Sequence, residues 1–126
     1  MNAPTRDIKD YLVTETSLVF GTTLFIGILP EQAGLTVSLF DTSGMSPEPN
    51  AIRNPTIQVL VRGALGGYEA AYAQMEDILT QLHALANTTI NSTNYIQIWK
   101  LTEPNHVGND EKGRPIFSCT LRISRT

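Results

Sequence analysis

The sequence contains little of what marks a disulfide-stabilised or nucleic-acid-binding protein. Its 126 residues include one cysteine, Cys119, which excludes a disulfide within the chain and a multi-cysteine zinc site. Charged residues make up only 17%, and nine basic against twelve acidic residues give a formal net charge of −3. Because binding to nucleic acid depends on clustered positive charge, DNA is a poor candidate for a tightly bound partner.

Long apolar runs are absent as well. No stretch approaches the roughly 20 apolar residues that a membrane span needs, and the first ten residues lack the basic-then-apolar pattern of a signal peptide. We therefore expect a protein that has no membrane partner and that folds and works in the cytoplasm.

The chain does contain enough apolar residues for one hydrophobic core. Hydrophobic residues make up 41% of the sequence, and a chain of this length can bury about two-thirds of the surface that it exposes when unfolded. We therefore expect a single domain over residues 1–126. Cys119 lies inside an apolar run, so the sequence predicts a small buried side chain there.

The first half of the sequence predicts a short helix and three strands. Apolar residues on one side of a helical wheel predict a helix over residues 5–15. The apolar run 24–29 and the alternating run 35–40 predict two strands, paired as a hairpin. Residues 56–62 alternate and predict a third strand. Residues 41–55, with one glycine and three prolines, predict a long loop before it.

The second half predicts a long helix and two more strands. Apolar residues recur at three and four positions from Tyr68 to Ala86, which predicts a helix whose apolar face is covered by a sheet. Residues 95–101 and 115–124 alternate as antiparallel strands do, and residues 102–114 between them predict a second long loop. The sequence thus predicts an α+β fold, with a mainly antiparallel sheet of about five strands packed against one long helix.

No pattern in the sequence predicts catalysis, a cofactor site or a metal site. Glycines at 63, 66 and 67 open the long helix but lack the lysine and the spacing of a phosphate-binding loop. His106, Asp110 and Glu111 could together hold a metal ion, although their spacing matches no zinc or calcium motif. A small metal-dependent enzyme that uses these three residues is therefore a remote alternative.

The arginines are scattered along the chain rather than clustered. At a net charge of −3, we expect them to pair with carboxylates, either within the chain or across an interface, rather than to bind phosphate. These arginines are Arg53, Arg62, Arg114, Arg122 and Arg125.

Five segments of the sequence form an ordered set, namely LFIGILP at 24–30, LFDTSG at 39–44 with Pro47, NPTIQVLVRG at 54–63, IQIW at 96–99 and DEKGRPIFS at 110–118. In this order and spacing they resemble the minor capsid or tail terminator proteins of tailed phages, such as the lambda-like tail terminators. The resemblance runs from about residue 5 to Ile123. Its most specific feature is the pairing of the aspartate-led glycine turn with the later Gly-Arg-Pro.

The resemblance implies a non-enzymatic virion structural protein that acts in tail assembly and head–tail joining. Such a subunit would form a homo-oligomeric ring, typically a hexamer, that caps the tail tube, ends its polymerisation and offers an attachment surface to the head connector. The implied partners are further copies of the chain, the tail tube protein and connector or neck proteins, with DNA only as passing cargo. The implied location is the tail or neck of the virion, and the host cytoplasm during assembly. A head-completion or neck protein that binds the connector is the alternative.

The two long loops are expected to supply the contacts to other subunits or partners. We expect Asp41 to cap its own turn through its carboxylate, and Arg53 or Arg114 to reach an acidic residue of a neighbouring subunit. The alternative is that these residues only shape their own loops. The candidate interface residues are Asp41, Thr42, Gly44, Arg53, Asp110, Gly113 and Arg114.

Overall fold

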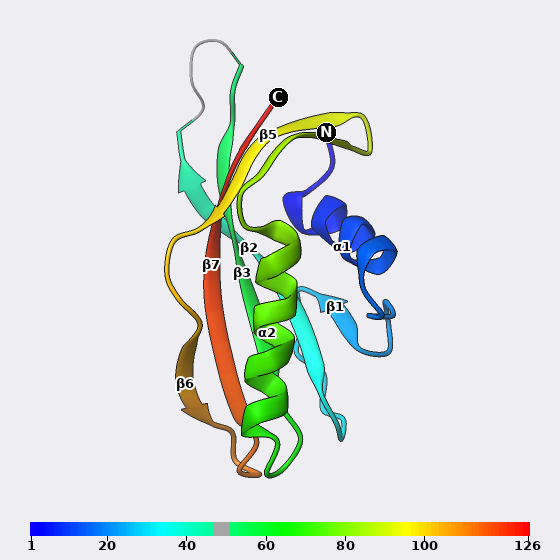
Figure 1. The fold of residues 1–126 in the computed structure, drawn as a ribbon, viewed down its shortest axis with the longest axis vertical. Helices are drawn as coiled ribbons and strands as arrows, with labels where there is room; N and C mark the ends of the chain where they lie inside the picture. Colours follow the sequence, from blue (N-terminus) through cyan, green and yellow to red (C-terminus); the bar gives the residue numbers. More distant parts are fainter. Residues whose placement is uncertain (47–50) are drawn as a thin grey trace.

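The computed structural model describes residues 1–46 and 51–126. Within these residues the chain forms two helices, α1 (Pro4–Glu15) and α2 (Tyr68–Leu82), and seven strands (Figure 1). Neither of these helices is long and apolar enough to cross a membrane. The strands are β1 (Leu24–Ile26), β2 (Thr36–Met45), β3 (Asn54–Arg62), β4 (Leu85–Ile90), β5 (Thr93–Lys100), β6 (Asn105–Asn109) and β7 (Pro115–Arg125).

All of these strands belong to one sheet, in which β7 is the central strand. The strand order is β1-β2-β3-β7-β5-β4, and β6 also pairs with β7. β5 and β6 lie end to end along the same side of β7, opposite residues 121–125 and 115–118 respectively. Both helices pack on one face of the sheet (Figure 1). The fold is therefore α+β with a mainly antiparallel sheet, as the sequence predicts.

The hydrophobic core lies between the helices and this face of the sheet. Alternate residues of β3 and β7 point into it in matched pairs, with Val59 opposite Cys119 and Val61 opposite Phe117. Cys119 is a free thiol and only 1% exposed, so the prediction of a buried side chain is confirmed. α2 contributes one buried stripe, formed by Ala71, Met75, Ile78, Leu79 and Leu82.

Two strands of the sheet were not expected from the sequence. β4 begins at Leu85, which the helical spacing had placed in the long helix; the helix instead ends at Leu82, and Ala84 adopts a left-handed conformation at φ 65°. Leu85 satisfies both patterns, because it lies one helical turn after Leu82 and also pairs with Ile98 of β5. β6 lies within the expected loop 102–114. It is an exposed strand with no apolar alternation, which is why periodicity did not reveal it.

The expected hairpin between the first two strands is wrong, because β1 and β2 run parallel. Leu24 is in register with Val37 and Ile26 with Leu39, so the chain must loop back between the two strands. Residues 27–35 form this connection. It contains Pro30, which cannot donate to a ladder, and two glycines with positive φ, so the strand ends earlier than the apolar run 24–29 suggested.

The first expected long loop is also shorter than predicted. β2 continues to Met45 and β3 begins at Asn54, while residues 47–50 of that expected loop lie outside the described residues. The ladder tolerates Gly44 and Pro55 because the register shifts between Thr42 and Met45, which forms a β-bulge. Pro55 therefore does not exclude strand pairing here.

Candidate functional site

The seven candidate interface residues divide into two groups at opposite ends of the sheet. The backbone of Arg53, just before β3, pairs with Arg125 at the end of β7, whereas Arg62 at the other end of β3 pairs with Ile116. By strand register, Thr42, Gly44 and Arg53 lie toward the Arg53 end of β3, with Asp41 nearer mid-strand opposite Ile57, and Asp110, Gly113 and Arg114 lie at the Arg62 end. The Arg53 end of β3 is uppermost in Figure 1. We call these two groups the upper site and the lower site.

Asp41 of the upper site does not cap its own turn, contrary to expectation. It lies within β2, and its carboxylate accepts hydrogen bonds from the backbone N–H (3.3 Å) and the hydroxyl (2.8 Å) of Thr5 in the first turn of α1. The N-cap residue of α1, Ala3, offers no side-chain acceptor. Asp41 thus supplies from the sheet the cap that the helix lacks.

Thr42 and Gly44 shape the bulge that ends the regular pairing of β2 and β3. The Thr42 hydroxyl is hydrogen-bonded to the Thr56 hydroxyl on the paired strand. Gly44 has a φ of +71°, and a Cβ at this position would lie 2.5 Å from the carbonyl oxygen of Asn54. Only glycine fits, because any side chain would collide with the backbone of the neighbouring strand.

Arg53 is an exposed charged residue of the upper site. Its backbone exchanges two hydrogen bonds of 2.9 Å with Arg125, which fixes its position beside the end of β7. Its side chain is exposed, and the Nη1 atom lies 3.4 Å from the sulfur of Met1. The guanidinium is therefore positioned by the sheet and remains open to another molecule.

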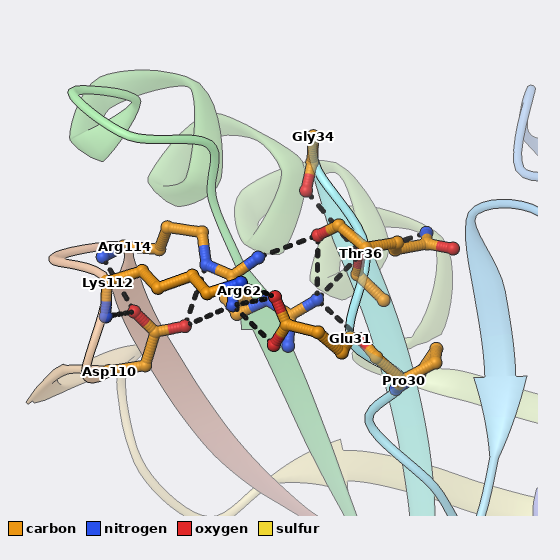
Figure 2. A network of polar contacts seen from close by, with 9 residues as sticks. Pro30, Glu31, Gly34, Thr36, Arg62, Asp110, Lys112 and Arg114 are labelled. Carbon is orange, nitrogen blue, oxygen red and sulfur yellow. Dashed lines mark hydrogen bonds and ion pairs between the residues drawn. The ribbon is translucent and has the colours of Figure 1, made fainter.

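The lower site is a tight turn that Asp110 organises (Figure 2). Asp110 Oδ1 accepts hydrogen bonds of 2.9 Å from the backbone N–H groups of Lys112 and Arg114, and Oδ2 accepts one of 2.7 Å from Arg114 Nε. Gly113 adopts a φ of +77° and donates its N–H to the Asp110 carbonyl. The structure thus brings Asp110, Gly113 and Arg114 together, as an aspartate-led turn requires.

Arg114 also joins this turn to the loop between β1 and β2. Its Nη2 donates to both carboxylate oxygens of Glu31, at 3.0 and 2.9 Å, and its Nη1 donates to the carbonyl of Gln32 at 2.7 Å (Figure 2). Arg114 is only 6% exposed, and all three guanidinium nitrogens form hydrogen bonds within the chain. Any effect of Arg114 on a neighbouring subunit would therefore act through the shape of this surface.

Arg62 and Glu31 complete the lower network. Glu31 was not among the residues expected from the sequence. Arg62 Nη2 donates to the carbonyl oxygens of Pro30 (2.6 Å) and Gln32 (3.2 Å), which holds the β1–β2 loop against the end of β3. No spacing or motif marks Glu31, because its partners lie about 80 residues away in the sequence. Only the folded sheet places them together.

The charges of the lower network shift the protonation of its two carboxylates. Hydrogen bonds from Lys112 and then from Arg114 lower the pKa of Glu31 below its ordinary value. Burial alone would raise the pKa of Asp110, but the hydrogen bonds from the backbone and side chain of Arg114 outweigh it and lower that pKa. Both carboxylates are therefore stabilised in their charged form.

A second buried ionic cluster ties the N-terminal helix to the last strand. Asp7 of α1 is completely buried, accepts a hydrogen bond from the Tyr95 hydroxyl and lies 3.8 Å from Arg125 Nη1. Burial, and next the Asp7 hydrogen bond, raise the pKa of Tyr95.

The expected pairing of arginines with carboxylates within the chain is confirmed for Arg114 and Arg125. Arg62 instead binds carbonyl oxygens.

The residues considered for a metal site do not converge on one point. His106 Nε2 lies 3.2 Å from Asn109 Oδ1, and its ring packs on Phe117. The Asp110 carboxylate faces Arg114 rather than His106. Within the described ranges, no three His, Cys, Asp or Glu side chains are grouped closely enough to hold a metal ion.

Residues 11–126, nearly the whole chain, match the family described as bacteriophage tail terminator protein. The chain belongs to this family. Tail terminators are structural components of the phage tail and not enzymes, so the two sites described above are candidate surfaces for assembly. No curated protein sequence matches this tail terminator.

A solved structure shares the fold of this tail terminator. A chain from the structure titled "Virion of native gene transfer agent (GTA) particle" superposes with a TM-score of 0.77 at 17% sequence identity. The match covers 98% of this chain and 94% of that chain. The α+β architecture therefore occurs in a virion-like particle at low sequence identity.

Proposed function

We propose that this tail terminator forms a ring, of six copies, on the last ring of the tail tube. There it ends tube polymerisation and presents a surface to the head connector. The observation that carries the proposal is the division of the candidate residues into an upper and a lower site at opposite ends of one sheet. A subunit in such a ring needs two different ends, one for the tube and one for the connector.

The structure of both ends supports contacts with other proteins. At the lower end, Ala33, Gly34, Ala64 and Leu65 line a hollow of about 420 Å³ beside the Arg114 network. Leu65 in this hollow is 76% exposed, so an apolar side chain is available there for a partner to cover. At the upper end, Arg53 presents an exposed guanidinium on a fixed backbone. Rigidly held loops of this kind commonly carry recognition.

DNA is expected to pass through the ring without binding to it. Each subunit has a formal net charge of −3, and three of its arginines, Arg62, Arg114 and Arg125, are buried. Few cations therefore remain for contacts with phosphate groups. This agrees with a passage for DNA rather than a DNA-binding site.

The direct test is polymerisation of purified tube protein with and without this protein, with tube lengths measured by electron microscopy. We expect added protein to shorten the tubes and to sit at one end of each. Tubes of unchanged length with uncapped ends would overturn the proposal. Binding to tailless heads but not to tubes would instead identify a head-completion or neck protein.

The two candidate arginines can be tested in the same assay. Arg53→Ala removes an exposed side chain, so we expect normal folding and weaker capping. Arg114→Glu places a third carboxylate beside Asp110 and Glu31, and Arg114 lies outside the hydrophobic core. We expect this variant to remain folded by circular dichroism but to cap tubes or bind the connector poorly. Normal capping and normal connector binding by Arg114→Glu would show that the lower site is not needed for assembly.

A further inference from the structure

Two exposed patches with aromatic side chains lie on opposite sides of the molecule. The first, the tyrosine patch, comprises Tyr68 and Tyr72 of α2 and His106 and Val107 of β6. The second, the phenylalanine patch, comprises Arg6, Lys9 and Val13 of α1 and Phe20. In Figure 1, β6 lies at one side of the sheet and α1 with β1 at the other. β6 and β1 thus lie on opposite sides of α2 in this view.

The tyrosine patch is a rigid surface built around a core residue. The rings of Tyr68, Tyr72 and His106 lie 4.9, 5.6 and 5.2 Å from the ring of Phe117, which is itself buried. Tyr68 and Tyr72 nevertheless remain 47% and 40% exposed. Aromatic side chains that are already fixed by packing lose little conformational entropy when another surface covers their exposed faces.

The phenylalanine patch has a comparable arrangement on α1. Lys9 Nζ lies 4.6 Å from the centre of the Phe20 ring and forms an ion pair of 2.6 Å with Asp10. Phe20 is 50% exposed, and Val13 is 41% exposed. The Arg6 side chain is exposed and forms no hydrogen bond or ion pair within the described residues, although its charge acts on nearby Asp10. Its guanidinium is therefore accessible to a carboxylate of another subunit.

Each patch has one exposed charged side chain that forms no ion pair within the described residues, and these two charges are opposite in sign. α2, which carries both tyrosines, contains Glu69, Glu76 and Asp77 but no lysine or arginine. Glu69 is exposed next to Tyr68 and forms no ion pair within residues 1–46 and 51–126. The phenylalanine patch carries the exposed guanidinium of Arg6, whose charge is opposite to that of Glu69. Surfaces of opposite charge that both contain exposed apolar rings are suited to bind one another.

Open strand edges adjoin both patches. Within the described part of the chain, β6 pairs with a strand only on its β7 side, and β1 only on its β2 side, apart from one bridge between Leu24 and Phe20. Unpaired edges are normally avoided or covered in proteins, because they pair readily with other chains. Both sides of the sheet therefore have the properties of a surface that a neighbouring molecule covers.

We propose that the tyrosine patch of one copy binds the phenylalanine patch of the next copy, head to tail. This inference rests on the proposed ring function and names the surfaces that build the ring. Two different patches on opposite sides of a subunit form a heterologous contact, which closes into a ring when the rotation between copies allows it. The upper and lower sites then stay free for tube and connector.

The test uses two full-length variants, each with one patch blocked by a charge. Phe20→Glu blocks the phenylalanine patch and Tyr72→Glu blocks the tyrosine patch. Each variant alone should form no ring, by light scattering or by microscopy of tails. When mixed, they should form a one-to-one heterodimer and nothing larger, because each variant keeps one intact patch. Leu101→Glu is the matched control, because Leu101 is 49% exposed and lies outside both patches and both sites, and it should form rings normally.

A second experiment covers the case in which rings exist only on tubes. Tails are assembled with a subunit that carries both Phe20→Cys and Tyr72→Cys and are treated with a flexible bis-maleimide. We expect a ladder of covalent multimers, whereas either single cysteine variant should give no ladder. Cys119 is buried and should not react. Dimers without a ladder would indicate a two-fold contact and overturn the proposal.

Charge reversal provides a variant that leaves the aromatic packing untouched. Arg6→Glu and Glu69→Arg should each reduce ring formation about tenfold, and the double variant should restore it, because the patches then exchange their signs. If none of these variants affects rings or tails while tubes are still capped, the inference fails and the proposed function stands. If the unaltered protein caps no tubes, the proposed function itself fails.

Discussion

The Tyr95 hydroxyl donates a hydrogen bond to the buried carboxylate of Asp7, a residue 88 positions earlier in the chain. Asp7 is completely buried and also accepts hydrogen bonds from the side-chain amides of Asn2 and Asn91. These contacts join α1, the β4–β5 turn and the start of β5. The charge at the start of α1 is therefore part of the interior rather than of the surface.

Removal of this hydroxyl should destabilise the fold. Tyr95→Phe leaves one oxygen of a buried carboxylate without its donor, which costs about 1–3 kcal/mol and should lower Tm by roughly 3–10 °C. Thermal unfolding followed by circular dichroism measures this. Tyr68→Phe is the matched control, because the Tyr68 hydroxyl is in an exposed ring, and its Tm should hardly change. Equal Tm values for Tyr95→Phe and Tyr68→Phe would contradict a stabilising role of the hydrogen bond between Tyr95 and Asp7.

Gly44 should tolerate no side chain. Gly44→Ala combines the strain of a positive φ with a collision against the Asn54 carbonyl, so we expect a loss of about 2–5 kcal/mol. Gly21→Ala shares the positive φ, but no atom lies within 4 Å of its added Cβ, so only about 1–2 kcal/mol should be lost. Urea unfolding of both variants gives their free energies of unfolding and so separates the cost of the collision from that of the backbone strain. Equal losses of stability would exclude a collision at Gly44.

The lower network should make stability depend on pH in the acid range. Glu31 and Asp110 have pKa values below their ordinary 4.5 and 3.8, so their contribution is complete above these values. It should disappear as the pH falls through the lower values of the folded protein. Glu31→Gln should show a smaller loss of stability in acid than the unaltered protein. Urea midpoints at pH 7 and pH 3 give the comparison, and identical losses would exclude Glu31 from this effect.

The Cys119 thiol should be inert while the protein is folded. Burial raises its pKa, which disfavours the reactive thiolate, and the side chain is only 1% exposed. A chromogenic disulfide reagent should react with it only at the rate of unfolding, and at once in urea. Phe20→Cys should add one fast-reacting thiol. Fast reaction of the unaltered folded protein would show that the β7 region opens readily.

The periodic parts of the sequence were sufficient to predict most of the core. The stripe of α2 and the alternation of β3, β5 and β7 each have a buried face that repeats, so the fold class and these elements were confirmed. β4 and β6 lack such a repeat, because they lie at exposed edges. The direction of β1 depends on a connection that has no periodicity at all.

The candidate site was predictable only where its contacts are local. Asp110, Gly113 and Arg114 lie within five residues, so the turn chemistry is visible in the sequence. The partner of Asp41 is Thr5 and that of Arg114 is Glu31, and both pairs depend on the folded sheet. Contact of the seven residues with another subunit or partner stays a prediction, and the ring and capping assays test it.

The central place of β7 has a consequence for synthesis of the protein. β7 is the last strand along the chain, yet β3, β5 and β6 all pair with it. While the ribosome is still translating residues 115–125, these three earlier strands have no central partner, and the nascent chain cannot close its core. A folded subunit therefore arises only after β7 has emerged from the ribosome, so under the proposed function a partly synthesised chain does not cap a growing tail.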